Sequence, residues 1–258
     1  MPARLAGAVL AALLAAAPPA AAQAPVVAAA ADLRFALPEV AAAFALDTGE
    51  RVRLSFGSSG NFARQIRQGA PYEVFLSADE GYVLALAADG FTRDRGTLYA
   101  IGRLALVVPE GSPLAVDGSL GDLAAALDDG RLGRLAIANP AHAPYGRAAE
   151  EALRHAGVWP RIRPHLVLGE NVAQAAQFAL EGGAAGGLVA YSLALAPQVA
   201  AAGARIALVP AAYHAPLRQR IVLVAGAGAV AERFYAFVRG PAARRTLRAY
   251  GFTLPGES

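Results

Sequence analysis

The sequence contains no cysteine and no lysine among its 258 residues. Without cysteine the protein forms no disulfide bond and carries no lipid on an N-terminal cysteine, so its stability rests on its core. Without lysine it cannot complete the glycine-rich phosphate loop that many nucleotide-binding proteins use. Valine, leucine, isoleucine and phenylalanine are frequent enough to form that core, within a hydrophobic fraction of 56%.

A clustered basic surface is also missing. The formal net charge is only +3, and the arginines are scattered among the acidic residues along the whole chain. Binding to nucleic acid requires basic side chains that are gathered on one face. We therefore expect no nucleic-acid partner.

The N-terminus has the pattern of a secretory signal peptide. Arg4 precedes an apolar stretch from Leu5 to Ala17, and two prolines and several small residues lead to a cleavage pattern near Ala22 or Ala24. The apolar stretch is shorter than the roughly 20 residues of a membrane-spanning helix. We expect residues 1–24 to be removed and the mature protein to be exported to the periplasm.

Short strand patterns alternate with helical patterns along the mature chain, which is typical of α/β proteins with mainly parallel sheets. Two such sets follow one another without a linker, so we expect two lobes. The chain is expected to cross between them near Gly102 and near Pro210. The predicted first lobe then contains residues 25–102 and 211–258, and the second contains residues 103–210.

The segment Phe56-Gly57-Ser58-Ser59-Gly60-Asn61 joins an alternating strand pattern to an amphipathic helix pattern. Two glycines and two hydroxyl groups thus stand where a helix begins. The first backbone N–H groups of a helix lack partners inside it, and the helix dipole is positive there. This segment is therefore a candidate site for an oxyanion.

Several segments together resemble the periplasmic molybdate-binding proteins of ABC importers, in the right order and over essentially the whole mature chain. The resemblance implies a type II periplasmic binding protein: two α/β lobes that close on a tetrahedral oxyanion and deliver it to a permease in the inner membrane. It also implies a monomer without a cofactor, whose ligand is molybdate or tungstate. The matching segments are Ala29–Leu33, Ser55–Gly60, Ala63–Ile66, Gly69–Pro71 with Val74–Asp79, Phe234–Tyr235, Arg239–Pro241 and Tyr250–Phe252.

The resemblance also implies which residues contact the oxyanion. The second serine of the family's pair falls on Ser59, and backbone donors of two later loops fall on Tyr145 and Val172. Two positions depart from the common pattern. Asp32 stands where many members have serine, and the position of a tyrosine donor holds alanine, with Tyr191 one residue further on.

Asp32 raises an electrostatic problem. A carboxylate about 4 Å from an oxyanion is repelled by roughly 4 kcal/mol per ligand charge at an effective dielectric constant of 20. Three arrangements avoid this repulsion: Asp32 caps the following helix, Asp32 is protonated, or Asp32 accepts a proton that the ligand carries. Aspartate is among the best N-cap residues, which favours the first arrangement.

Other polar residues have plainer alternatives. Ser59 taken alone suits an N-cap better than a ligand contact, but the flanking glycines together with the family resemblance favour the contact. The phenols of Tyr145 and Tyr191 can donate to a ligand or simply pack. A lone loop histidine such as His142 suits the surface better than a metal site, and Arg64 suits the flank of its helix.

The main alternatives are a binding protein for another oxyanion, such as phosphate or sulfate, and a secreted serine hydrolase that uses Ser58 or Ser59. The hydrolase hypothesis is weak, because neither serine lies in a Gly-x-Ser-x-Gly pattern. We expect a binding protein rather than an enzyme. No metal site is expected beyond molybdenum held as molybdate.

Overall fold

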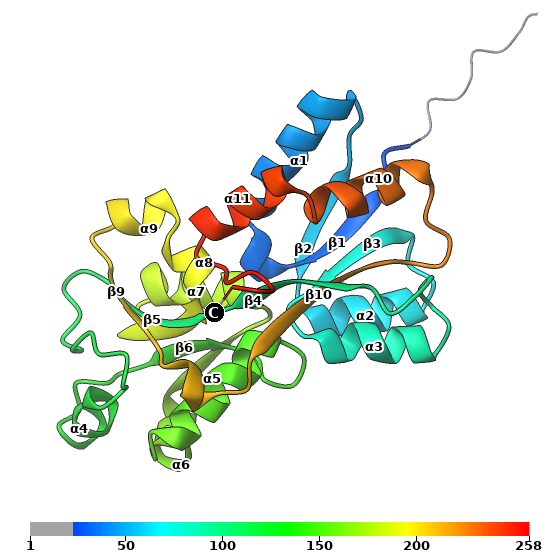
Figure 1. The fold of residues 1–258 in the computed structure, drawn as a ribbon. Coiled ribbons are helices and arrows are strands. Elements are labelled where there is room, and N and C mark those ends of the chain that lie inside the picture. The colour runs from blue at the N-terminus through cyan, green and yellow to red at the C-terminus, as the bar shows by residue number, and fades with distance from the viewer. Residues whose placement is uncertain (1–22, 258) are drawn as a thin grey trace, which may run out of the picture.

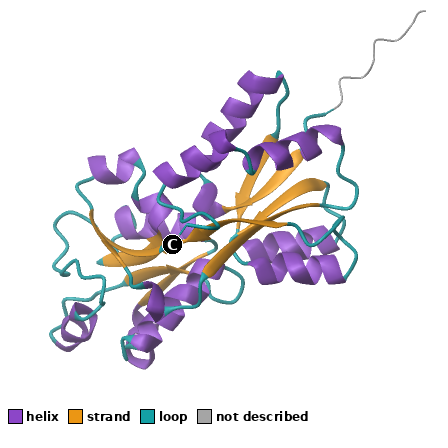
Figure 2. Ribbon diagram, viewed as in Figure 1, coloured by secondary structure: helices purple, strands orange, loops and turns teal. Residues whose placement is uncertain are grey.

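Two five-stranded sheets, each covered by helices, form the two lobes of the structure, a computed structural model that describes residues 23–257 (Figures 1 and 2). Most of the predicted signal peptide, residues 1–22, lies outside the described part. The first sheet has the order β2-β1-β3-β10-β4, with β1 Val26–Ala30, β2 Arg53–Gly57, β3 Tyr72–Ser77, β4 Thr97–Gly102 and β10 Leu217–Leu223. The second has the order β7-β6-β8-β5-β9, with β5 Leu104–Val108, β6 Leu135–Ala138, β7 Leu166–Gly169, β8 Gly186–Ala190 and β9 Arg205–Leu208.

Helices cover both faces of the first sheet. The lobe contains the 3-10 turn η1 Ala31–Leu33 and helices α1 Ala36–Thr48, α2 Ser59–Arg67, α3 Glu80–Ala88, α10 Ala229–Val238 and α11 Pro241–Ala249. The second lobe contains α4 Asp122–Asp128, α5 Pro144–His155, α6 Trp159–Ile162, η2 Arg163–His165, α7 Val172–Leu180, α8 Tyr191–Ala194 and α9 Pro197–Ala201. The short turn η3 Ala211–Tyr213 precedes β10.

The alternation of strand side chains explains the two helical layers. Val27 and Ala29 of β1 pack in one core with α1, α10 and α11, whereas Ala28 packs in another with α2 and α3. Because successive residues of a strand face opposite sides, a strand covered on both sides is apolar throughout. Figure 1 shows α1, α10 and α11 on one side of the sheet and α2 and α3 on the other.

Both sheets are mixed but mainly parallel, as predicted, because one strand in each sheet runs against the other four. Each has two parallel and two antiparallel strand pairs. The strands that run against both neighbours are β10 and β5. Each is the first strand after the chain passes from one sheet to the other, so it enters its sheet from the junction of the lobes rather than through a helix of its own lobe.

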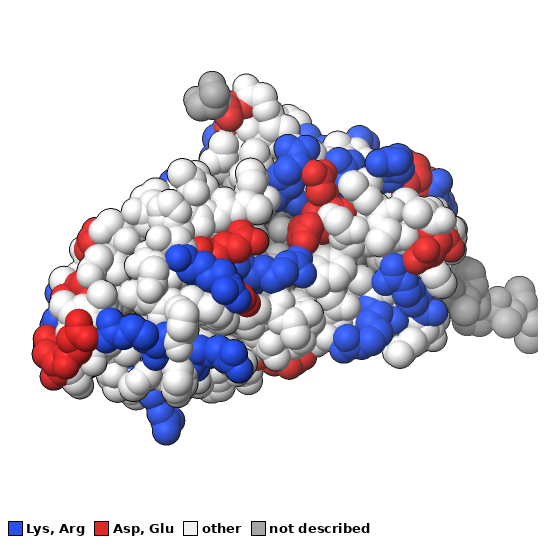
Figure 3. Space-filling model, turned by 90° about the horizontal axis from the view of Figure 1, so that it is seen from below, with Lys and Arg blue, Asp and Glu red and all other residues white. Residues whose placement is uncertain are grey.

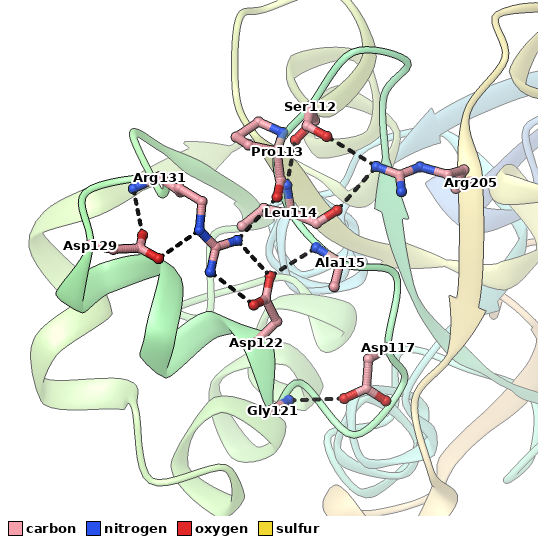
Figure 4. A network of polar contacts seen from close by, with 10 residues as sticks. All are labelled: Ser112, Pro113, Leu114, Ala115, Asp117, Gly121, Asp122, Asp129, Arg131 and Arg205. Atoms are coloured by element: carbon pink, nitrogen blue, oxygen red, sulfur yellow. Dashed lines mark hydrogen bonds and ion pairs between the residues drawn. The ribbon is translucent and has the colours of Figure 1, made fainter.

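Polar contacts fasten the loop before α4 to the second lobe (Figure 4). The guanidinium of Arg131 donates to both Asp122 and Asp129, and Asp122 also accepts from the N–H of Ala115. Arg205 of β9 donates to the carbonyls of Ser112 and Leu114. These contacts hold a segment with little regular structure and lie outside the cavity described below.

The described residues include no helix long and apolar enough to cross a membrane. Basic and acidic side chains are interspersed on the face of the molecule seen in Figure 3. Many of them are paired, as Glu80 is with Arg218 and Arg220.

Candidate functional site

A small buried cavity lies where four strand ends from both lobes meet. β1, β2, β6 and β7 each lead at their carboxyl end into η1, α2, α5 or α7, and each of these segments contributes to the cavity wall. Open α/β sheets bind ligands at this end of their strands. The lining residues are Ala30, Ala31, Asp32, Gly57, Ser58, Ser59, Ala78, Ala143, Pro144, Tyr145, Asn171 and Val172. The free volume between them is only about 10 Å³, far below the roughly 300–1,000 Å³ of sites for drug-sized molecules.

Three helices begin at this wall, and each has at its start one cavity-lining residue whose backbone N–H has no partner among the described residues. In α7, the Asn171 side chain accepts from the N–H groups of Ala173 and Gln174, which leaves that of Val172. In α5, Pro144 has no N–H and Gly146 donates to Ala143, which leaves that of Tyr145. In α2, the N–H of Gly60 donates to the carbonyl of His142, whereas those of Ser59 and Asn61 have no partner among the described residues. Of these two, Ser59 lines the cavity.

The Ser59 side chain is oriented by a hydrogen bond from β3's end. The backbone N–H of Ala78 donates to Ser59 Oγ at 3.0 Å, and Ser59 is fully buried. A hydroxyl has a single hydrogen to donate. Since Oγ accepts from Ala78, its own hydrogen is available to a group in the cavity.

Asp32 belongs to a buried polar network rather than to a helix cap. Neither η1 nor α1 has a side-chain cap hydrogen bond, so the capping arrangement favoured by the sequence is wrong. Asp32 Oδ2 instead accepts from the Tyr145 hydroxyl at 3.1 Å and from Gln219 Nε2. The Tyr99 hydroxyl donates to Gln219 Oε1 at 2.6 Å and completes the network.

Burial raises the pKa of Asp32 to about 6, although the side chains of Gln219 and Tyr145 and nearby backbone groups lower it in part. The ionised form loses its hydration and gains only neutral donors, so the neutral acid is favoured. Burial and the nearby Asp32 carboxyl also raise the pKa of Tyr145 well above its ordinary value. The phenol thus remains a donor.

Four of the five residues expected at the ligand line this cavity: Asp32, Ser59, Tyr145 and Val172. Tyr191 does not. Its N–H donates to the carbonyl of Arg103, and its ring lies so close to Gly251 that a Cβ there would be 2.6 Å away. The N–H and the ring of Tyr191 are thus used within the fold.

The two lobes contact each other around the cavity. The N–H of Gly60 donates to the carbonyl of His142 at 3.0 Å, and His142 Nδ1 lies 3.0 Å from Ser58 Oγ. Asn61 donates to Glu170, and Arg147 pairs with Asp79. His142 therefore lies at the junction of the lobes rather than on the open surface expected from its isolation in the sequence. The described residues hold no cluster of three or more potential metal ligands.

Comparison with known proteins agrees with this architecture. Residues 25–253 match the family model of bacterial extracellular solute-binding proteins. The chain belongs to this family. It is 38% identical to the molybdate-binding protein ModA of Rhodobacter capsulatus, over 83% of this chain and 82% of the relative, and 33% identical to that of Escherichia coli, over 96% of each.

Among solved structures, the periplasmic molybdate-binding protein of Azotobacter vinelandii superimposes with a TM-score of 0.79 at 33% identity. The match covers 90% of this chain and all of that one. The two-lobed α/β fold of a periplasmic binding protein is thereby confirmed. This extracellular solute-binding protein resembles transport proteins that are not enzymes, as the sequence predicts.

Sequence reasoning missed Gln219 and Tyr99, which hold Asp32 from β10 and β4. Gln219 is 187 positions from Asp32 along the chain. One signal was present: Gln219 is a lone uncharged polar residue between two arginines just before the apolar end of a strand, and it is fully buried. A buried amide in a strand needs hydrogen-bond partners.

Proposed function

We propose that this protein captures a tetrahedral oxyanion in the periplasm, most readily molybdate or tungstate, and delivers it to the permease of an ABC importer. One observation carries the proposal: three unpartnered N–H groups, each at the start of a different helix, converge on one small buried cavity. Helix N-termini bind anions through such groups and through their dipoles. The molybdate-binding relatives from three bacteria support the choice of ligand.

We further propose that the oxyanion is held by Ser59, through its N–H and its hydroxyl, by the N–H groups of Tyr145 and Val172, and by Asp32. All four groups contact the oxygen atoms of the ligand, not the metal. No arginine lines the cavity, so the anion is neutralised by dipoles instead of a counter-charge. The protein acts as a monomer whose lobes comprise residues 25–102 with 211–258, and residues 103–210.

Calorimetric titration of the ligand-free protein with molybdate, tungstate, sulfate and phosphate tests the proposed ligand. We expect molybdate and tungstate to bind alike, because hydrogen bonds hardly distinguish two anions of such similar size and charge. Sulfate should bind more weakly, because its shorter bonds leave the converging donors too far apart. If the protein binds sulfate or phosphate more tightly than molybdate, its ligand is another oxyanion. If none of the four anions binds, the proposal is overturned.

Ser59→Ala should weaken molybdate binding by about 10- to 100-fold. The change removes one hydrogen bond to a charged ligand, worth about 1.5–3 kcal/mol, and leaves the N–H of Ala78 without its acceptor. Ser119→Ala, in an exposed loop where the hydroxyl donates only to Asp117, is the matched control. Equal affinities of Ser59→Ala and the control would remove Ser59 from the proposed site.

A further inference from the structure

The two oxygen atoms of the Asp32 carboxyl have opposite surroundings. Oδ2 accepts two hydrogen bonds, from Tyr145 and Gln219. Oδ1 is buried and has no hydrogen-bond partner among the described residues. A buried polar atom without a partner costs about 1–3 kcal/mol, so it calls for an explanation. Asp32 is 1% exposed and lines the cavity, so a bound ligand is the natural partner of Oδ1.

The hydrogen bonds around Oδ2 leave no room for a proton there. Tyr99 donates to Gln219 Oε1, which fixes the orientation of that amide and points its Nε2 hydrogens at Asp32 and at the Tyr145 oxygen, 3.3 Å away. The Tyr145 hydrogen is then directed to Oδ2. Since both positions near Oδ2 are filled by donors, a proton on this carboxyl resides on Oδ1.

Among the described residues, no positively charged side chain contacts Asp32, and Arg34 at the end of η1 is exposed. The segments packed against η1 are β2, α7 and α8. Their only ionisable side chains are Arg53, at the opposite end of β2 from the cavity, and Tyr191, whose ring packs against Gly251. From α5 and β4, Asp32 faces Tyr145 and Tyr99, whose raised pKa values keep them neutral.

We propose that the bound oxyanion and Asp32 Oδ1 share one proton, so that molybdate, which carries none at neutral pH, is bound together with one proton from solvent. This inference rests on the proposed function. With the proton on Oδ1, the neutral acid donates to a ligand oxygen, and the unpartnered atom becomes a fifth donor of the site. Without it, two negative charges about 4 Å apart repel by roughly 8 kcal/mol for a doubly charged ligand at an effective dielectric constant of 20.

The affinity should therefore depend on pH in a defined direction. Ligand-free Asp32 loses its proton as the pH rises through about 6, while a neighbouring anion holds the proton to higher pH. Above about pH 6, each unit of pH should weaken molybdate binding about tenfold, and below it the affinity should level off.

The direct test is calorimetric titration of the intact mature protein with molybdate at about pH 8, in two buffers that differ in ionisation enthalpy. The difference between the two heats gives the number of protons taken up. We expect about one proton per molybdate for the parent protein. An uptake near zero, or an affinity that is flat between about pH 6.5 and 8.5, would overturn the inference.

Asp32→Asn identifies the group that takes up the proton. Asparagine keeps an acceptor for Tyr145 and Gln219 and places an N–H donor at the position of Oδ1, so it matches the neutral acid. We expect this variant to bind molybdate without proton uptake and with no loss of affinity between about pH 6.5 and 8.5. Asp32→Ser, which also lacks the ionisable group, serves if the asparagine variant does not fold. Undiminished proton uptake in either variant would overturn the inference.

Asp47→Asn is the matched control. Asp47 is exposed near the end of α1, away from the cavity, so its variant should take up a proton as the parent does. A loss of uptake in this control would also count against Asp32. Failure of the proposed function has a different signature, since no oxyanion would then bind to any of these proteins at any pH.

Discussion

Asp32→Asn is expected to make the ligand-free protein more stable at about pH 8, by up to about 3 kcal/mol. Burial raises the pKa of Asp32 from 3.8 to about 6. Between these two values the folded protein binds a proton that the unfolded chain does not. The stability of the parent protein therefore falls as the pH rises through this window, and the full cost of the buried charge is present above it. Asparagine has no such cost.

Urea unfolding of both proteins, followed at about pH 4 and pH 8, measures the effect. The difference in unfolding free energy should be large at the higher pH and nearly vanish at the lower one. Asp47→Asn, an exposed change of the same kind, should not differ from the parent by more than about 0.5 kcal/mol at either pH. A difference that is equal at both pH values would show that packing, not ionisation, separates Asp32 from asparagine.

Gly146→Ala is expected to destabilise the protein by about 3 kcal/mol and to weaken oxyanion binding as well. A Cβ at this position would lie 2.3 Å from the carbonyl oxygen of Ala138, the last residue of β6. The clashing atom belongs to the backbone, which cannot rotate away as a flexible side chain can. Helix α5 therefore has to move away from β6, at an overpacking cost of about 1–3 kcal/mol or more. The N–H of Tyr145 moves with it.

Thermal or urea unfolding and a molybdate titration test the two parts of this prediction separately. Gly133→Ala is a suitable control, because a Cβ there meets no atom within 4 Å and its backbone lies outside the left-handed region. The control should retain the stability and affinity of the parent. Parent-like stability of Gly146→Ala would show that the junction of β6 and α5 relaxes at little cost.

The loops of the candidate site were predictable because their signals are local. Glycine, serine and asparagine mark the starts of α2 and α7, and Pro144 marks the start of α5. The neighbouring strands are short apolar runs or, in β2, an alternating pattern. The five expected site residues came from the family resemblance, and four of them line one cavity.

The behaviour of Asp32 and Tyr191 was not predictable from such signals. Asp32 meets its partners only because α5 of the second lobe and β10 of the first bring Tyr145 and Gln219 to it, 113 and 187 residues away. Gly102 takes part in the same junction, since a Cβ there would lie 2.2 Å from the Tyr145 hydroxyl. Tyr191 was expected at the ligand from the family resemblance, as the neighbour of a common tyrosine donor position, yet its ring packs against Gly251 of the C-terminal segment.

The sequence by itself determined the α/β class, the strand-to-helix loops and the family resemblance, because periodicity, capping and turn residues act over a few positions. Only the tertiary structure decided what surrounds the Asp32 carboxyl, which donors remain unpartnered, and that both sheets are mixed. Those features depend on how distant segments of two lobes meet. Burial at that junction raises the pKa of Asp32 to about 6, which makes it the proton-binding group of the proposed site.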